Sequence, residues 1–204
     1  MQGKQSFSFE IFPPRKDDGI EKIYTTLAEL APLRPNFISV TFGAGGSANS
    51  KSTLDIASLV KDKYEVPSIV HLPCIHQSKE QILGILDECK KRNLKKILAL
   101  RGDIVEDKPV SKDFKFASDL VRFIKENGDF EVFAACYPEK HNEAKSVVED
   151  IHNLKTKVDS GVSMLLTQLF FSNDDFYRFK EACELAKISV PIYAGIMPVA
   201  NKRQ

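Results

Sequence analysis

Short apolar runs rich in β-branched residues recur about every thirty residues along this chain, and their spacing limits the possible folds. The runs span residues 6–12, 37–42, 68–74, 97–100, 132–137, 164–171 and 192–196. Longer segments between them have the i, i+3, i+4 apolar spacing of surface helices, at residues 20–30, 52–64, 78–92, 114–126, 143–158 and 174–186. This alternation predicts a parallel β-sheet covered by helices.

A parallel sheet of this kind either closes into a barrel or stays open as a dinucleotide-binding sheet. Gly43, Gly45 and Ala48 form a literal G-x-G-x-x-A, which favours the open sheet. That fingerprint is normally answered by an acidic residue at the end of the next strand, but here residues 71–76 read HLPCIH. Because every strand ends in polar or glycine residues, we expect an incomplete (β/α)8 TIM-type barrel with about seven strands, forming a single domain over residues 1–204.

The composition argues against several classes of partner. Lys and Arg number 29 against 28 Asp and Glu, so no basic surface predicts nucleic-acid binding. No run approaches the ~20 apolar residues of a membrane helix, and the N-terminus has no apolar signal stretch. The four cysteines are far apart, without a CxxC pair: Cys74, Cys89, Cys136 and Cys183. We therefore expect a soluble protein of the reducing cytoplasm.

The first predicted strand carries a carboxylate among apolar neighbours. Residues 8–15 read SFEIFPPR, so Glu10 lies among aromatic and aliphatic side chains. Burial raises the pKa of a carboxyl group, and a glutamate so tuned can act as a general acid near neutral pH. The alternative is that Glu10 turns outward or pairs with Arg15, and composition alone does not choose between the two.

The fourth predicted strand ends in Arg101, Gly102 and Asp103. These residues could form an ordinary turn with a surface ion pair. At the carboxyl edge of a barrel, however, the glycine would let the backbone approach a ligand, and Asp103 could face a cationic group. The edge position favours a binding role.

Two polar clusters have weaker patterns. His71, Cys74 and His76 are residue types that bind zinc, but strand alternation puts positions 71 and 76 on opposite faces. We therefore expect no metal site and assign His71 to a hydrogen bond with a ligand. Asp150, Asn153 and Lys157 share one helix face; they could reach a sugar or phosphate, although a solvated stripe has the same spacing.

Nine segments, in order along the chain, resemble methylenetetrahydrofolate reductase of the bacterial type. They are SFEIFPPR, FISVTFGAGGS, HLPCI, ALRGD, ASDLV, AACYPEKHNEA, NLKTKVDSG, TQLFF and GIMPV. The resemblance implies a flavoprotein barrel of one-carbon metabolism and methionine biosynthesis. Its members use NADH or NADPH to reduce FAD, and then reduce 5,10-methylenetetrahydrofolate to 5-methyltetrahydrofolate.

The resemblance also implies roles for individual residues. Glu10 matches the acid that helps open the folate ring, and Asp103 matches the aspartate beside the flavin that meets the pterin. Gln168 and Gln204 match folate contacts, and Thr41 matches a position near the nicotinamide. The remaining positions that match FAD contacts are Phe42, Ala44, His71, Arg101, Gly102, Phe116, Ala117, Tyr137, His141, Ala144, Asp150, Asn153, Thr156 and Lys157.

Three of these positions depart from the pattern of the bacterial members. Phe42 and Phe116 stand where tyrosine is common, and Thr156 stands where arginine is common. The aromatic rings are kept but their hydroxyl contacts are lost. Without the arginine, Lys157 is the expected cation for a phosphate.

The chain ends at Gln204, after the seventh predicted strand, whereas a complete barrel usually takes ~250 residues. An unpaired edge would make this chain a poor catalyst and an unstable monomer. We therefore expect a homo-oligomer or a partner subunit that covers the open edge. A non-catalytic or partner-dependent barrel subunit is the alternative function, and a Rossmann dehydrogenase is the alternative enzyme.

Overall fold

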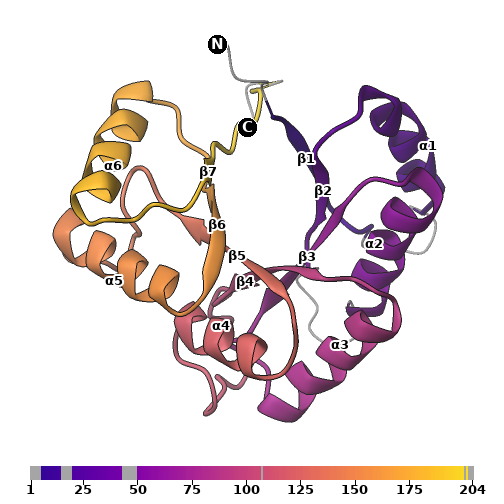
Figure 1. The fold of residues 1–204 in the computed structure, drawn as a ribbon, viewed down its shortest axis with the longest axis horizontal. Helices are drawn as coiled ribbons and strands as arrows, with labels where there is room; N and C mark the ends of the chain where they lie inside the picture. The colour runs from indigo at the N-terminus through magenta and orange to yellow at the C-terminus, as the bar shows by residue number, and fades with distance from the viewer. Residues whose placement is uncertain (1–5, 15–19, 43–49, 107, 200, 202–204) are drawn as a thin grey trace.

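The computed structural model describes residues 6–14, 20–42, 50–106, 108–199 and 201, and in them strands alternate with helices. The strands are β1 (Ser8–Ile11), β2 (Phe37–Val40), β3 (Ser68–Pro73), β4 (Lys96–Leu100), β5 (Glu131–Cys136), β6 (Val162–Thr167) and β7 (Ile192–Tyr193). The helices are α1 (Ile20–Leu30), the short 3-10 helix η2 (Ala31–Leu33), α2 (Ser50–Tyr64), α3 (Lys79–Lys91), α4 (Ala117–Glu126), α5 (Val147–Asp159) and α6 (Asn173–Leu185). Figure 1 shows the strands as a curved wall with the helices outside it.

The sheet confirms the predicted incomplete (β/α)8 barrel. Each strand pairs in parallel with the next, in the order β1-β2-β3-β4-β5-β6-β7. The wall curves far enough for the ring of Phe37 on β2 to contact that of Tyr193 on β7, with 5.2 Å between centroids. Within the described residues β1 pairs with β2 and β7 pairs with β6. The fold is therefore a seven-stranded part of a TIM-type barrel.

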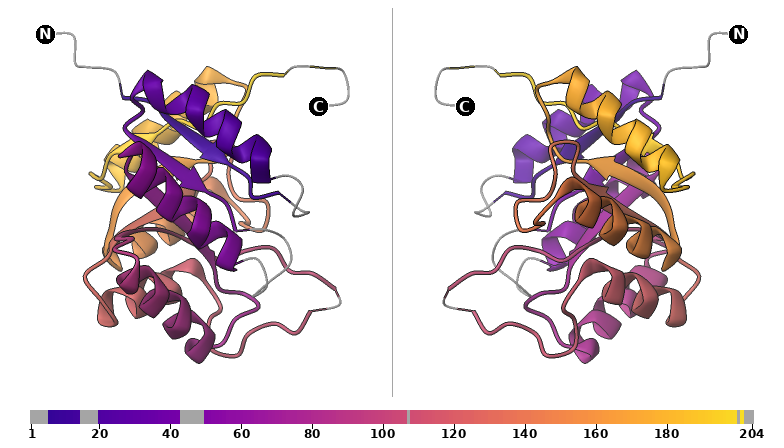
Figure 2. Two further views of the ribbon diagram at one scale, coloured as in Figure 1. Left: turned by 90° about the vertical axis from the view of Figure 1, so that its right-hand side faces the viewer. Right: turned by 90° about the vertical axis from the view of Figure 1, so that its left-hand side faces the viewer.

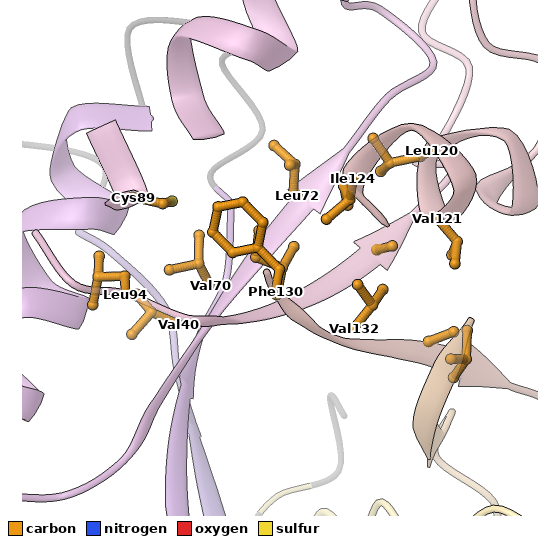
Figure 3. Packing of buried hydrophobic residues seen from close by; sticks show 14 of the residues in the cluster. Val40, Val70, Leu72, Cys89, Leu94, Leu120, Val121, Ile124, Phe130 and Val132 are labelled. Carbon is orange, nitrogen blue, oxygen red and sulfur yellow. The ribbon is translucent and has the colours of Figure 1, made fainter. Parts of the chain in front are cut away.

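The outer face of the sheet packs against the helices. Alternate strand residues such as Val40, Val70 and Val132 are fully buried there with Leu86 and Ile124 of the helices. Figure 3 shows this packing, with Leu72 of β3 and Phe130, just before β5, among the labelled side chains. The apolar side chains of the helices, which recur with helical spacing, pack against this face of the sheet.

The inner face of the sheet has its own apolar filling. Phe37, Ile69, Leu98 and Phe133 form a second buried cluster, and Tyr193 packs against it. These residues lie at the strand positions between those of the outer core, as the twofold alternation of a strand requires. A parallel sheet buried on both faces explains why the predicted strands are nearly continuous apolar runs.

Several predicted boundaries were wrong at the carboxyl edge, among them that of β7, which ends at Tyr193 and not at 196. Helix α5 begins at Val147 and not at 143, because the Ser146 side chain accepts a hydrogen bond from Glu149 N (3.1 Å) and caps the helix there. Helix α4 begins at Ala117 and not at 114, and β6 ends at Thr167 and not at 171. Each correction lengthens a loop after a strand. Helix α3 is capped by Ser78, whose side chain accepts a hydrogen bond from Gln81 N (3.3 Å).

The four cysteines are free and buried. Burial raises the pKa of Cys74 and of Cys89 to about 12, so these thiols stay protonated at neutral pH. None of the described helices is long and apolar enough to cross a membrane.

The burial of strand side chains on both faces predicts which large-to-small substitutions lower the stability of the protein. Ile97 on β4 is fully buried in the outer core, whereas Val148 on α5 is 80% exposed. Replacing Ile97 by alanine removes buried methyl groups and leaves a cavity, so we expect the free energy of unfolding to fall by about 2–5 kcal/mol. Val148→Ala should change it by less than about 0.5 kcal/mol. Urea denaturation of both variants gives the comparison, and equal losses would contradict the assignment of the outer core.

Candidate functional site

The main pocket lies at the carboxyl ends of β4 and β5, where α4 and α5 flank the sheet. Its volume is about 440 Å³. Ten of the residues predicted to contact FAD line it: Arg101, Phe116, Ala117, Tyr137, His141, Ala144, Asp150, Asn153, Thr156 and Lys157. The structure therefore brings these predicted residues together in one concave site, at the edge where barrel enzymes bind their ligands.

The pocket lining includes residues from both the outer and the inner core, at the carboxyl ends of the strands. Ala99 and Cys136 in its lining belong to the outer core. Leu100, also in the lining, packs against the inner cluster. A ligand bound between the helices could therefore extend over the strand ends towards the mouth of the barrel.

One wall of the pocket carries a paired arginine. The Arg101 guanidinium binds the Glu143 carboxylate with both terminal nitrogens, the Nη2–Oε1 bond being 2.7 Å long. This pairing raises the pKa of Arg101 and lowers that of Glu143. Arg101 also donates from Nε to Gly102 O (3.2 Å). The guanidinium is thereby held at the rim of the pocket, where it can meet an anion.

Lys157 supplies a second cation deeper in the pocket. Its Nζ donates to Ala135 O at 2.6 Å, so the ammonium is anchored to β5. Burial lowers the pKa of Lys157, while the nearby Asp150 carboxylate opposes that shift. The first turn of α4, which includes Ala117 and Ser118, faces the same space and adds the positive end of a helix. All three features favour an anionic group in the pocket.

The loop after β5 forms the second wall and is fixed by its own hydrogen bonds. Lys140 adopts a left-handed backbone (φ 74°), and its Nζ donates to His141 O (2.9 Å) and Ala144 O (2.6 Å). His141 N donates to Asp150 Oδ2 at 3.1 Å, which ties the loop to α5. The rings of Tyr137 and His141 meet edge to face, 4.6 Å apart. These contacts hold the pocket-lining side chains in place before any ligand arrives.

Glu10 and His71 form a separate pair inside the barrel. Their strand positions alternate with those of the outer core, and Glu10 Oε2 lies 3.6 Å from His71 Nε2. Burial raises the pKa of Glu10, the direction predicted from its apolar neighbours, although 46% of its side chain is exposed. Burial lowers the pKa of His71 to about 4, so the ring is neutral at physiological pH. The buried Nε2 has no hydrogen-bond partner among the described residues.

The remaining predicted site residues lie around these two places. Thr41 and Phe42 follow β2 and are partly buried, while Asp103 and Gln168 are exposed at the ends of β4 and β6. Gly102 has a left-handed backbone (φ 86°), and a Cβ there would lie 3.0 Å from Pro73 Cβ, so glycine is required. Ala44, Gln204 and the alternative Glu10 partner Arg15 lie outside the described residues.

The side chains first considered for zinc diverge in space. His71 points into the barrel, whereas Cys74 packs in the outer core with its Sγ 3.9 Å from Phe116 O. His76 instead contacts the loop after β4. The described residues contain no group of three His, Cys, Asp or Glu side chains that could hold a metal ion.

Two residues at this edge were missed by the sequence analysis. Glu143 was placed in helix α5, yet it lies in the preceding loop and binds Arg101. His76 was weighed only as a metal ligand, yet both its ring nitrogens contact loop carbonyls. The position of both residues after a strand could have suggested a site role, but their partners are distant in sequence and leave no local pattern.

Comparisons of the sequence with known proteins agree on one family. The sequence profile of the family described as methylenetetrahydrofolate reductase matches residues 1–204. The chain is 39% identical over 204 residues to 5,10-methylenetetrahydrofolate reductase of Pectobacterium carotovorum, covering 100% of this chain and 67% of that protein. It is 37% identical over 215 residues to methylenetetrahydrofolate reductase (NADH) 1 of Arabidopsis thaliana, covering 98% of this chain and 36% of the plant protein.

A solved structure supports the fold alone. A Clostridium thermocellum protein, described as binding two copies of 5-methyl-5,6,7,8-tetrahydrofolic acid, has a TM-score of 0.60 to this chain at 11% identity. The match covers 93% of this chain and 65% of that one.

The neutral His71 ring predicts a dependence of stability on pH. The folded chain protonates this ring only near pH 4, whereas an unfolded histidine does so near 6.5. Between these values the unfolded state binds more protons, so acidification from pH 6.5 to 4 should lower the free energy of unfolding by about 3 kcal/mol through this ring. Glu10, with its raised pKa, has the opposite sign and offsets part of the loss.

Urea denaturation of the native protein and of His71→Gln across this pH range tests the expectation. The variant should lose the His71 part of the slope. The same substitution at His152, which is exposed on α5, serves as a matched control for replacing a histidine at the surface. Identical slopes in the native protein and both variants would show that His71 titrates as an ordinary histidine.

Proposed function

Because the chain belongs to the methylenetetrahydrofolate reductase family, we propose that it binds FAD and uses NADH or NADPH to reduce 5,10-methylenetetrahydrofolate to 5-methyltetrahydrofolate. The observation that carries this proposal is the pocket at the tips of β4 and β5, lined by ten of the predicted FAD contacts. The plant relative carries NADH in its name, which supports NADH as a donor. We also propose a cytoplasmic role in supplying methyl groups for methionine biosynthesis.

The chemistry of the pocket fits FAD. Arg101, Lys157 and the first turn of α4 would hold the diphosphate, because all three favour an anion. Asp150 and Asn153 would accept or donate hydrogen bonds at ribose hydroxyls. When bound, FAD supplies the hydride acceptor and donor that links the nicotinamide to the folate.

At two positions that depart from the bacterial pattern, a phosphate or hydroxyl contact is lost and other residues would have to bind that part of FAD. Thr156 has no charge to offer a phosphate, and its hydroxyl donates to His152 O (3.1 Å). Lys157 keeps two of its three N–H groups free of the Ala135 bond, so it can still bind an anion. The exposed ring of Phe116 offers an apolar face without a hydroxyl.

Glu10 is the proposed general acid. Opening the five-membered ring of the substrate requires a proton on the leaving amine. Burial of Glu10 raises its pKa, which keeps part of the carboxyl population protonated as a donor. His71, neutral and 3.6 Å away, adds no positive charge that would favour the carboxylate.

Asp103 is the proposed stabiliser of the cation that ring opening leaves. A carboxylate near an iminium favours the charged state electrostatically. The side chain is exposed at the end of β4, next to the pocket residue Arg101. Gln168, at the end of β6, and Gln204 are proposed to bind the folate, and Thr41 to lie near the nicotinamide.

Glu10→Gln should separate the two halves of the reaction. The variant loses the acid but keeps the shape, so folate reduction should slow by about 10²–10⁴-fold while flavin reduction by NADH changes little. Anaerobic stopped-flow absorbance of the flavin-loaded protein measures the two rates separately. The exposed Glu126→Gln is the matched control and should leave both rates unchanged. Equal losses in the two half-reactions of Glu10→Gln would mean that Glu10 has only a structural role.

The cofactor itself gives an independent test. Burial raises the pKa of Cys136 in the pocket lining, so its thiol is a poor nucleophile towards the flavin. We therefore expect denaturation of the purified yellow protein to release intact FAD. Chromatography of the released flavin against FAD and FMN standards identifies it. Release of FMN would contradict the assignment of Asp150, Asn153 and Lys157 to the adenylate half, and a colourless protein unable to take up FAD would contradict the proposed function.

A further inference from the structure

Two neighbouring loops at the carboxyl edge are joined along their length. The loop after β3 donates from Cys74 N and Ile75 N to Arg101 O, at 3.1 and 2.8 Å. The loop after β4 returns two bonds, from Ser111 N to Ile75 O and from Ser111 Oγ to Gln77 O, both 2.6 Å. Figure 2 shows the long β4–α4 loop reaching away from the barrel. Its course is therefore set by the shorter loop beside it.

His76 lies in the middle of this junction. Its Nδ1 is 2.9 Å from Pro109 O and its Nε2 is 3.0 Å from Asp103 O. Val105 N also donates towards Nε2, at 3.3 Å. One ring thus contacts the β4–α4 loop at three backbone groups, on both sides of its outermost part.

Either neutral tautomer of His76 holds this loop. With the proton on Nε2, the ring donates to Asp103 O. With the proton on Nδ1, it donates to Pro109 O and accepts from Val105 N. In both cases one side chain from the β3–α3 loop fixes the backbone near Asp103.

The Asp103 side chain itself is held weakly, through its electrostatic attraction to the Arg101 guanidinium. Strand β4 ends at Leu100, and Gly102 follows in a left-handed conformation. Among the described residues the Asp103 carboxylate makes no hydrogen bond, and its side chain is exposed. The direction of this carboxylate therefore depends on its backbone, and the Asp103 carbonyl contacts His76 Nε2.

We propose that His76 is a positioning residue that aims the Asp103 carboxylate at the folate. The inference rests on the proposed function, in which Asp103 stabilises the cationic substrate. His76 acts through the loop backbone and does not itself touch the substrate.

A double-mutant cycle tests the proposal in the flavin-loaded protein. His76→Phe keeps a planar ring but removes both nitrogens, so folate reduction should slow by about 10–100-fold, the usual effect of misplacing a reacting group by about 1 Å. Flavin reduction by NADH should change by less than about twofold. In an Asp103→Asn background, His76→Phe should cause no further loss, because its effect passes through that carboxylate.

Matched variants and a second measurement complete the test. His76→Gln keeps one donor and one acceptor and should recover part of the lost rate, while the exposed His152→Phe should have no effect. An equal loss from His76→Phe with and without the Asp103 carboxylate would overturn the proposal.

Amide hydrogen exchange separates this inference from the proposed function. His76→Phe should speed exchange at Val105 N–H and Ser111 N–H, whether or not the protein turns over folate. Unchanged exchange there would overturn the inference even in an active enzyme. A native protein that cannot reduce folate, but whose loop exchange responds as expected, would contradict the proposed function and retain the loop contact.

Discussion

Burial of the sheet on both faces is the constraint on which the rest of the structure depends. One set of strand side chains packs outward against the helices, and the alternate set fills the barrel interior around Phe37, Ile69 and Leu98. A strand in this position cannot shift by one residue without exchanging the two sets. The tips of the strands are fixed as a result, and the polar residues that follow them occupy defined places at one edge.

The polar residues at that edge lie in two different environments. Glu10 and His71 belong to the inner face, where burial favours the neutral form of each side chain. Arg101 and Lys157 belong to the pocket by the helices, where carboxylate and carbonyl partners hold two cations. Burial sets the direction of the Glu10 pKa shift, so the proposed proton donor lies in a different environment from the anion site.

The sequence predicted the strands, the helices and most of the pocket lining, because these follow from local periodicity and from family resemblance. It missed the start of α4 at Ala117, where the apolar Phe114 and Phe116 continue the helical pattern into a loop, and the start of α5 at Val147. The Arg101–Glu143 pair joins residues 42 positions apart, and no local pattern encodes such a contact. Nor does spacing reveal that the ring nitrogens of His76 contact Asp103 O and Pro109 O, since those contacts depend on how two loops run side by side.

The Arg101–Glu143 pair is suited to being replaced by a ligand. Its two side chains are 22% and 59% exposed, and pairs this accessible to water contribute roughly 0–1 kcal/mol to stability. A phosphate that took the place of the Glu143 carboxylate would offer the same bidentate geometry at little cost in lost contacts. Because the pair keeps the guanidinium ordered at the rim, little side-chain entropy remains to be lost on binding. Under the proposed function, Glu143 would pair with Arg101 in the free protein and give way to a phosphate of FAD, a role that fits an acidic residue in this wall of the pocket.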